Sequence, residues 1–180
     1  MIRNIACAVP VCLFVFSSSA FAEDVVDLAA RMIGRPYVWG AEGPNAFDCS
    51  GLTQFVYQKV GIELPRRAIS QSKVGDPAGS RLQRGDLLFV STDSRQSLVT
   101  HVGLYEGNGV MIDASKSHGR VRRDNLDERY WVERFMFARR VGPSAGRNRT
   151  TEPSSRSSGR RTTAIRIIER IAGELFKRPK

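Results

Sequence analysis

The stretch Phe47-Asp48-Cys49-Ser50-Gly51-Leu52 combines a helix start with a cysteine directly behind it. Aspartate is a favoured N-cap because its carboxylate accepts a hydrogen bond from a free backbone N–H of the first turn. An apolar stripe at helical spacing follows and a glycine ends it: Leu52, Val56, Val60 and Gly61. The stretch therefore predicts a helix that carries Cys49 in its first turn.

A second helix and a series of strands flank this helix in the sequence. Asp24 is a candidate cap for a helix that closes at Gly34, with apolar positions at Val25, Leu28, Ala29 and Met32. From Gly85 onward, short β-rich runs predict strands over 86–90, 100–105, 110–114 and 135–141. Helices that come first and strands that follow as a meander indicate an α+β fold with an antiparallel sheet.

The cysteine and the two histidines of the chain indicate nucleophilic chemistry. A cysteine attacks as its thiolate, and its pKa of about 8.5 is lowered by a helix N-terminus and by an adjacent imidazole. Of the two histidines, His101 and His118, the first opens a predicted strand, so a sheet can hold it rigidly. This favours His101 as the base for Cys49. The alternative is that Cys49 is a buried, inert thiol.

The predicted hairpin offers a group that would orient His101. If the loop is Gly107-Asn108-Gly109, Glu106 pairs with Val110, and Asp113 then lies diagonal to His101 on the same face. Diagonal neighbours are about 7–8 Å apart, which is within reach of a His–Asp contact. A two-residue turn would place Asp113 on the wrong face.

The first 22 residues have the pattern of a secretory signal peptide. Arg3 is followed by an apolar run over 5–16 and by small residues that end in Ala20-Phe21-Ala22. The run is shorter than the about 20 apolar residues that a membrane-spanning helix needs. We expect cleavage after Ala22 and export to the periplasm or the cell wall. Cleavage would remove the other two cysteines and leave Cys49 without a disulfide partner.

Six motifs between residues 25 and 140 together resemble the NlpC/P60 endopeptidases. They are Pro36-Tyr37-Val38-Trp39-Gly40, Phe47-Asp48-Cys49-Ser50-Gly51-Leu52, Leu64-Pro65-Arg66, Gly85-Asp86-Leu87-Leu88-Phe89, His101-Val102-Gly103-Leu104-Tyr105 and Met111-Ile112-Asp113-Ala114-Ser115. The resemblance implies a papain-like α+β domain over residues 23–142. It also implies a cysteine peptidase that cleaves the bond between γ-D-glutamate and a diamino acid in the stem peptides of bacterial peptidoglycan.

The same resemblance implies a role for each of five residues. Cys49 would be the nucleophile and His101 its base. Tyr37 would act at the oxyanion and substrate site. Asp48 and Ser50 would help to hold the free amine or the stem of the substrate, although Asp48 is equally well explained as a helix cap alone.

One catalytic position departs from the family pattern. The third residue, on the strand after the base, is most often histidine in the family and is Asp113 here. A carboxylate can accept a hydrogen bond from the imidazole and stabilise its charged form, so we expect activity to survive. The departure leaves His118 as an alternative orienting residue. Two neighbouring motif residues are interpreted structurally, Trp39 as a core aromatic and Arg66 as part of a solvated face.

The positive charge is concentrated at the C-terminal end, where residues 143–180 carry +7 of the net +10. Residues 143–163 have the composition of a disordered linker. Residues 164–180 form a basic amphipathic tail, predicted as a short helix with an apolar face at Ile165, Ile168, Ile171, Ala172, Leu175 and Phe176. This tail would bind an anionic envelope membrane or a protein partner, or it would be a solvated segment without a partner.

For the protein as a whole, we expect a monomer that binds peptidoglycan, and we expect no nucleic-acid partner, metal or cofactor.

Two other functions are compatible with the same residues. The Cys–His pair would also serve an amidase that cuts between muramic acid and L-alanine. The domain would otherwise be a catalytically silent module that binds the wall.

Overall fold

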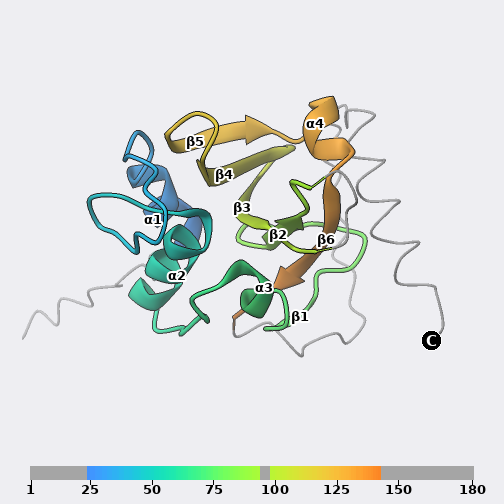
Figure 1. Cartoon of the computed structure of the whole chain (residues 1–180). Coiled ribbons are helices and arrows are strands. Elements are labelled where there is room, and N and C mark those ends of the chain that lie inside the picture. Colours follow the sequence, from blue (N-terminus) through green and yellow to red (C-terminus); the bar gives the residue numbers. More distant parts are fainter. Residues whose placement is uncertain (1–23, 94–97, 143–180) are drawn as a thin grey trace, which may run out of the picture.

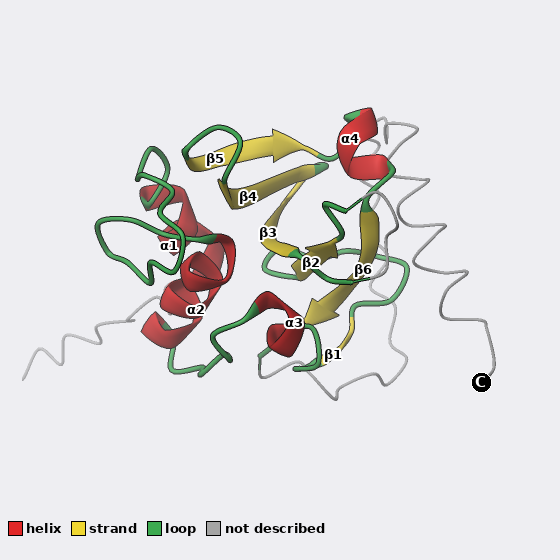
Figure 2. Ribbon diagram, viewed as in Figure 1, coloured by secondary structure: helices red, strands yellow, loops and turns green. Residues whose placement is uncertain are grey.

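The computed structural model describes residues 24–93 and 98–142. In this part of the chain, helices pack on a six-stranded antiparallel sheet (Figures 1 and 2), so the predicted α+β class is confirmed. The predicted signal peptide (1–22), the linker (143–163) and the amphipathic tail (164–180) lie outside the described residues.

Four helices and six strands make up the fold of the described residues. The helices are α1 (Val25–Arg31), α2 (Cys49–Lys59), α3 (Ala68–Gln71) and α4 (Arg129–Val132). The strands are β1 (Asp76–Pro77), β2 (Leu87–Val90), β3 (His101–Gly107), β4 (Val110–Ser115), β5 (Arg120–Asn125) and β6 (Phe135–Arg140). Their order across the sheet is β1-β6-β2-β3-β4-β5. The sequence patterns missed β5 and the three short elements α3, α4 and β1.

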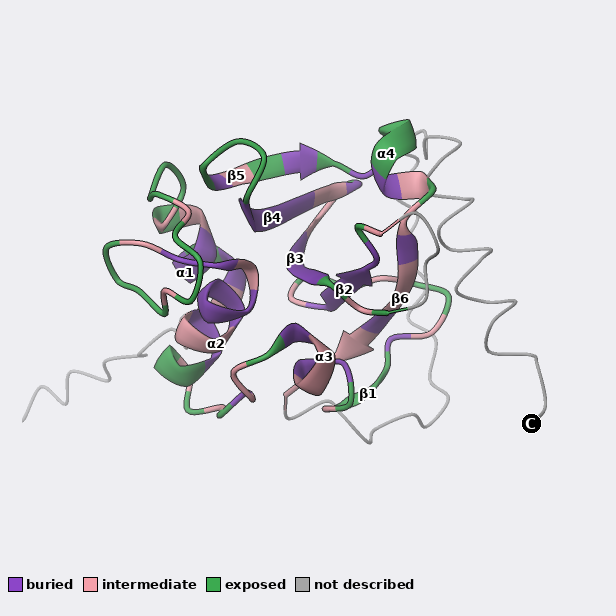
Figure 3. Ribbon diagram, in the orientation of Figure 1, coloured by how far each residue is buried: buried purple, intermediate pink, exposed green. Residues whose placement is uncertain are grey.

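The sheet is covered on both faces, which explains why its central strands are buried along their length (Figure 3). Side chains that alternate along β2, β3 and β4 pack with α1 and α2 in the larger core, which includes Val26, Leu52, Phe89, Leu104 and Ile112. The side chains on the opposite face of these strands form a smaller core with α4. It includes Leu88, Val90, Tyr105, Met111 and Trp131. The two helices that open the described chain therefore fix one face of β3, and the segment around α4 covers the other.

The β3–β4 hairpin reaches the predicted register by a different route. Gly107 pairs with Val110, so the turn has two residues, Asn108 and Gly109, both with positive φ as a type I′ turn requires. The expected pairing of Glu106 with Val110 is therefore wrong. However, Glu106 forms a β-bulge, and pairing resumes with Tyr105 opposite Met111. The bulge cancels the one-residue shift of the shorter turn.

Gly51 gives a test of how closely α2 packs on the preceding loop. A Cβ at this position would lie 2.1 Å from the backbone oxygen of Ala41 and 3.1 Å from Oδ1 of Asp48. Gly51→Ala should therefore lower the free energy of unfolding by about 1–3 kcal/mol, as overpacking does. Gln58→Ala on the exposed face of the same helix is the control and should stay within about 0.5 kcal/mol. Equal melting temperatures for the two variants would contradict this packing.

Candidate active site

The start of α2 is held by the carboxylate of Asp48. Its Oδ1 accepts a hydrogen bond from the Gly51 N–H at 2.7 Å, and its Oδ2 accepts one from the Gly40 N–H at 3.0 Å. Cys49 is the first residue of the helix, where the partial positive charge of the helix dipole favours a thiolate. The thiol is half-buried and free, and the backbone N–H of Val102 donates to its sulfur.

His101 and Asp113 meet on the sheet beside this thiol. Nε2 of His101 lies 2.8 Å from Oδ2 of Asp113, and both side chains are buried. Since Nε2 is engaged with the carboxylate, Nδ1 is the ring nitrogen left for the hydrogen bond that joins His101 to Cys49. The structure thus brings the three predicted residues into one line, from carboxylate to imidazole to sulfur.

The electrostatics of this line favour a charged sulfur and a charged ring. Burial alone would raise the pKa of Cys49, but the hydrogen bond and the charge of His101 outweigh it and lower that pKa below its usual value. Burial alone would lower the pKa of His101, but Asp113 and Cys49 raise it well above its usual value. The two groups stabilise each other as a thiolate–imidazolium pair.

A cleft of about 660 Å³ opens over Cys49 and His101. Aromatic residues line it from two sides, Tyr37 and Trp39 from the loop before α2 and Tyr130 and Trp131 from α4. Trp39 is 81% exposed, so its interpretation as a core aromatic is wrong. A cleft of this size, with aromatic walls and a few polar groups near its base, is typical of a site for a small organic ligand or a short peptide.

Tyr37 is placed in the cleft by backbone pairing. Its N–H donates to the Gly119 carbonyl, and the residue forms a bridge with Phe47. Burial raises the pKa of the Tyr37 phenol, and the nearby negative charges of Cys49 and Asp48 raise it further. The hydroxyl therefore keeps its proton at neutral pH and is available as a hydrogen-bond donor.

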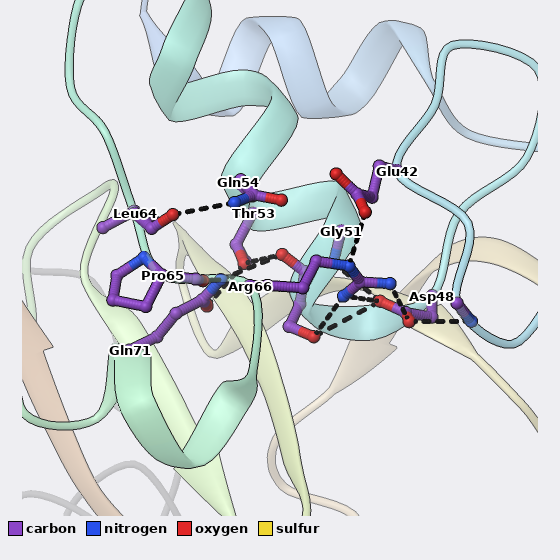
Figure 4. A network of polar contacts seen from close by, with 11 residues as sticks. Glu42, Asp48, Gly51, Thr53, Gln54, Leu64, Pro65, Arg66 and Gln71 are labelled. Atoms are coloured by element: carbon purple, nitrogen blue, oxygen red, sulfur yellow. Dashed lines mark hydrogen bonds and ion pairs between the residues drawn. The ribbon is translucent and has the colours of Figure 1, made fainter.

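The remaining predicted substrate residues, Asp48 and Ser50, are both engaged by Arg66. Figure 4 shows the Arg66 guanidinium beside the carboxylate of Asp48. The guanidinium lies 3.0 Å and 2.5 Å from the two carboxylate oxygens of Asp48 and donates to Oγ of Ser50 at 3.0 Å. Its Nε also pairs with Glu42 at 2.9 Å. The interpretation of Arg66 as part of a solvated face is therefore wrong. Within the described chain, the lining of the cleft does not include Asp48 or Ser50.

His118 lies at the rim of the same cleft, on the turn between β4 and β5. Its Nδ1 is 3.0 Å from Oγ of Ser115 and 3.1 Å from Oγ of Ser117. The ring of His101 is positioned instead by the hydrogen bond that Oδ2 of Asp113 accepts from its Nε2. The geometry thus favours Asp113 over His118 as the orienting residue.

Two residues near the site had no sequence motif to mark them. Trp131 stacks on His101 with the ring centroids 6.0 Å apart. Asp124 is buried on β5 and lines the cleft near Asp113. The sequence gives no clear signal for Asp124, because four of the six residues of β5 are charged and its buried positions do not alternate.

Two kinds of feature are absent from residues 24–93 and 98–142. These residues hold no cluster of histidine, cysteine or acidic side chains suited to a metal ion. They also include no helix that is long and apolar enough to cross a membrane.

Comparison with known proteins shows the family to which the chain is similar. Residues 34–140 match the model of the NlpC/P60 family. The chain is 43% identical over 111 residues to a probable endopeptidase of Corynebacterium glutamicum, a match that covers 61% of this chain and 51% of that protein. It is 39% identical over 116 residues to the murein DD-endopeptidase MepH of Escherichia coli, covering 62% and 42% of the two chains.

Two further matches come from Bacillus cereus. A γ-D-glutamyl-L-lysine dipeptidyl-peptidase is 34% identical over 123 residues, with 68% of this chain and 37% of that protein covered. The crystal structure of an NlpC/P60 family protein superposes with a TM-score of 0.62 at 34% identity, covering 66% and 39% of the two chains. The chain spans about half or less of the length of the curated relatives named here.

Arg66→Ala should destabilise the protein in a pH-dependent way. Burial alone would raise the pKa of Asp48, but Arg66 and the N–H groups of Gly51 and Gly40 lower it. The stabilisation from a lowered carboxyl pKa is present above the unfolded value near 3.8 and is lost as pH falls through the folded value. We expect a loss of about 1–3 kcal/mol at pH 7 that shrinks below about pH 4.

Thermal unfolding of the wild type and of Arg66→Ala, measured at pH 7 and again below about pH 4, tests this effect. The matched control is Arg67→Ala, which removes an exposed guanidinium from the next position. A melting-temperature difference that is the same at both pH values, or equal to that of the control, would contradict the Asp48–Arg66 pairing.

The state of Cys49 can be read from its alkylation rate. Because the pKa of Cys49 is lowered, iodoacetamide should modify it readily at pH 6–7, with the site located by peptide mass spectrometry. His101→Ala should move the midpoint of the pH–rate curve up to about 8.5, the value of a free thiol, or above it, because burial then raises the pKa without the opposing imidazole. His118→Ala, at the rim of the cleft, should leave the curve in place. If His101→Ala reacts as fast as the wild type at pH 6, the imidazole does not lower the pKa.

Proposed function

Because the chain belongs to the NlpC/P60 family, we propose that it is a cysteine peptidase of bacterial peptidoglycan. The bond that we propose it hydrolyses joins γ-D-glutamate to the diamino acid of a stem peptide. The single observation that carries this proposal is the line from Asp113 through His101 to Cys49 at the base of an open cleft.

The geometry supports a two-step reaction. The Cys49 thiolate attacks the carbonyl carbon of the scissile amide, and the carbonyl oxygen becomes negatively charged. The helix N-terminus and the hydroxyl of Tyr37 would stabilise that charge. The imidazolium of His101 then gives its proton to the leaving amine, the C–N bond breaks, and an acyl-enzyme thioester remains.

The second step returns the enzyme to its starting state. A water molecule gives a proton to the neutral imidazole of His101 as its oxygen attacks the thioester. The new tetrahedral intermediate collapses, restores the thiolate and releases the product as a carboxylic acid, which loses its proton to the solvent. Throughout both steps, Asp113 accepts from Nε2, so Nδ1 stays directed at the sulfur and the imidazolium is stabilised when it forms.

The choice of bond is supported by a relative rather than by the cleft alone. One of the relatives is named as a γ-D-glutamyl-L-lysine dipeptidyl-peptidase, while another is named as a DD-endopeptidase. Both names describe peptidases that are similar to this chain, and the second names murein. We therefore propose peptidoglycan as the substrate, with the γ-D-glutamyl bond as the specific target, and we propose that the enzyme works in the periplasm or at the cell wall after export.

The amine-binding role proposed for Asp48 and Ser50 has a structural condition. Both side chains are held by the guanidinium of Arg66, which would repel a substrate ammonium. Direct binding of the free amine therefore requires Arg66 to move aside. With Arg66 in place, the two residues would instead support the substrate site indirectly, by fixing the start of α2.

Digestion of defined muropeptides tests the reaction and its bond. The wild-type protein should release fragments that correspond to cleavage after γ-D-glutamate, and Cys49→Ala should lower that release by at least about 10³-fold while its melting temperature is kept. Fragment masses identify the bond, since a free lactyl group on muramic acid would indicate the amidase instead. Undiminished release by Cys49→Ala would exclude this mechanism.

The silent wall-binding module makes the opposite prediction. It would bind purified wall without releasing any fragment, with or without Cys49.

A further inference from the structure

The strand pairing places Asp124 beside Asp113. On β4 and β5, Asp113 pairs with Arg122 and Met111 pairs with Asp124. Paired residues and residues two apart on a strand share a face of the sheet, so Asp113 and Asp124 are diagonal neighbours on one face. Asp113 is fully buried and Asp124 is 3% exposed. The two carboxyl groups are within hydrogen-bond reach of each other.

The oxygen atoms of the two groups fit together only if a proton lies between them. One oxygen of each carboxyl has a partner, since Oδ2 of Asp113 meets Nε2 of His101 and Oδ1 of Asp124 lies 3.0 Å from Nε of Arg122. The other two, Oδ1 of Asp113 and Oδ2 of Asp124, are buried and find no donor among the described residues. Ionised carboxylates only accept hydrogen bonds, so a shared proton satisfies both atoms at once.

We propose that Asp124 is a positioning residue that keeps its proton and donates it in a hydrogen bond to Asp113, which holds Asp113 against His101. This inference deepens the proposed function and rests on it for its catalytic meaning. The hydrogen bond runs from Oδ2 of Asp124 to Oδ1 of Asp113. The line of contacts then extends from Asp124 through Asp113 and His101 to the sulfur of Cys49.

The charges around the pair are consistent with one proton and one negative charge. Asp124 faces Asp113 on β4, Arg122 on its own strand and Glu128 ahead of α4. Burial, the hydrogen bond to Asp113 and the charges of Asp113 and Glu128 raise the pKa of Asp124 to about 7, while Arg122 opposes the rise. The imidazolium of His101 lies against Asp113, so the negative charge is better placed there than on Asp124.

The contact with Asp124 matters for Asp113, because no other group among the described residues donates a hydrogen bond to Oδ1 of Asp113. A carboxylate with one free oxygen can rotate, and rotation would weaken its contact with Nε2. The ring of His101 would then lose both its orientation and part of the charge stabilisation that supports the thiolate. A neutral donor at position 124 prevents this without adding a second negative charge.

Substitutions at position 124 separate the donor from the charge. Asp124→Asn keeps the shape and offers an amide N–H that donates at every pH, whereas Asp124→Ala removes the donor. At pH 6, the rate of Cys49 alkylation by iodoacetamide should stay within about threefold of wild type in Asp124→Asn. It should fall roughly tenfold in Asp124→Ala, which corresponds to about one unit of pKa. Glu106→Gln is the matched control, since it removes a carboxylate on the β3–β4 hairpin that pairs with Arg123 outside the cleft.

The pH dependence of stability gives a second, independent measurement. With a raised pKa, the folded state holds a proton that the unfolded state has lost, so wild-type stability falls as pH rises toward 7. Asp124→Asn lacks this group. Its melting temperature relative to wild type should therefore increase between pH 5 and pH 8, while that of Glu106→Gln should not.

Several results would overturn the proposal. Asp124→Asn as slow as Asp124→Ala would show that the donor is not what matters, and Asp124→Ala as fast as wild type would show that the residue has no role. Parallel melting curves for wild type and Asp124→Asn across pH would show that Asp124 carries no proton. None of these measurements uses peptidoglycan, so a protein that fails to cleave muropeptides would contradict the proposed function and leave this inference standing.

Discussion

The buried carboxylate of Asp48 is the contact on which the candidate site depends. It caps α2 through the Gly51 N–H, holds the preceding loop through the Gly40 N–H and binds the guanidinium of Arg66. Three segments that are separate in the sequence therefore meet at one side chain. Cys49 is the next residue along the chain, so the position of its sulfur depends on how firmly Asp48 holds the start of α2.

The sheet supplies the second constraint, which is the register between β3 and β4, because the register decides which side chains lie on the same face. His101 and Asp113 can touch only if both side chains leave the sheet on the same face, and a shift of one residue would send them to opposite faces. Gly103 lies between them in the register, and its missing side chain leaves room for Met111, whose Sδ would be 2.5 Å from a Cβ there. The site therefore combines a helix start, which sets the sulfur, with a strand register, which sets the ring and its carboxylate.

The sequence was sufficient to predict these parts because each has a strong local signal. A capping aspartate before an apolar stripe predicts α2, and β-rich runs on both sides of a Gly-Asn-Gly loop predict the hairpin, although its turn proved one residue shorter than expected. The parts that were missed depend on tertiary contacts. Arg66 has no local pattern to show that it pairs with Asp48, and exposed Trp39 looks like any core aromatic in sequence. Asp124 belongs to β5, an edge strand with four charged residues out of six, which no hydrophobic alternation marks clearly.

The bulge at Glu106 has a consequence for how this hairpin can change in evolution. The bulge lies between the turn and the first regular pair, Tyr105 with Met111. If a residue is gained or lost in the turn, a change at the bulge can therefore restore the register of the strands. A single insertion or deletion between His101 and Tyr105 has no such compensation, since it would turn the imidazole and the carboxylate to opposite sides of the sheet. We therefore expect hairpins of different lengths in related chains, but a constant spacing from the histidine to the first pair.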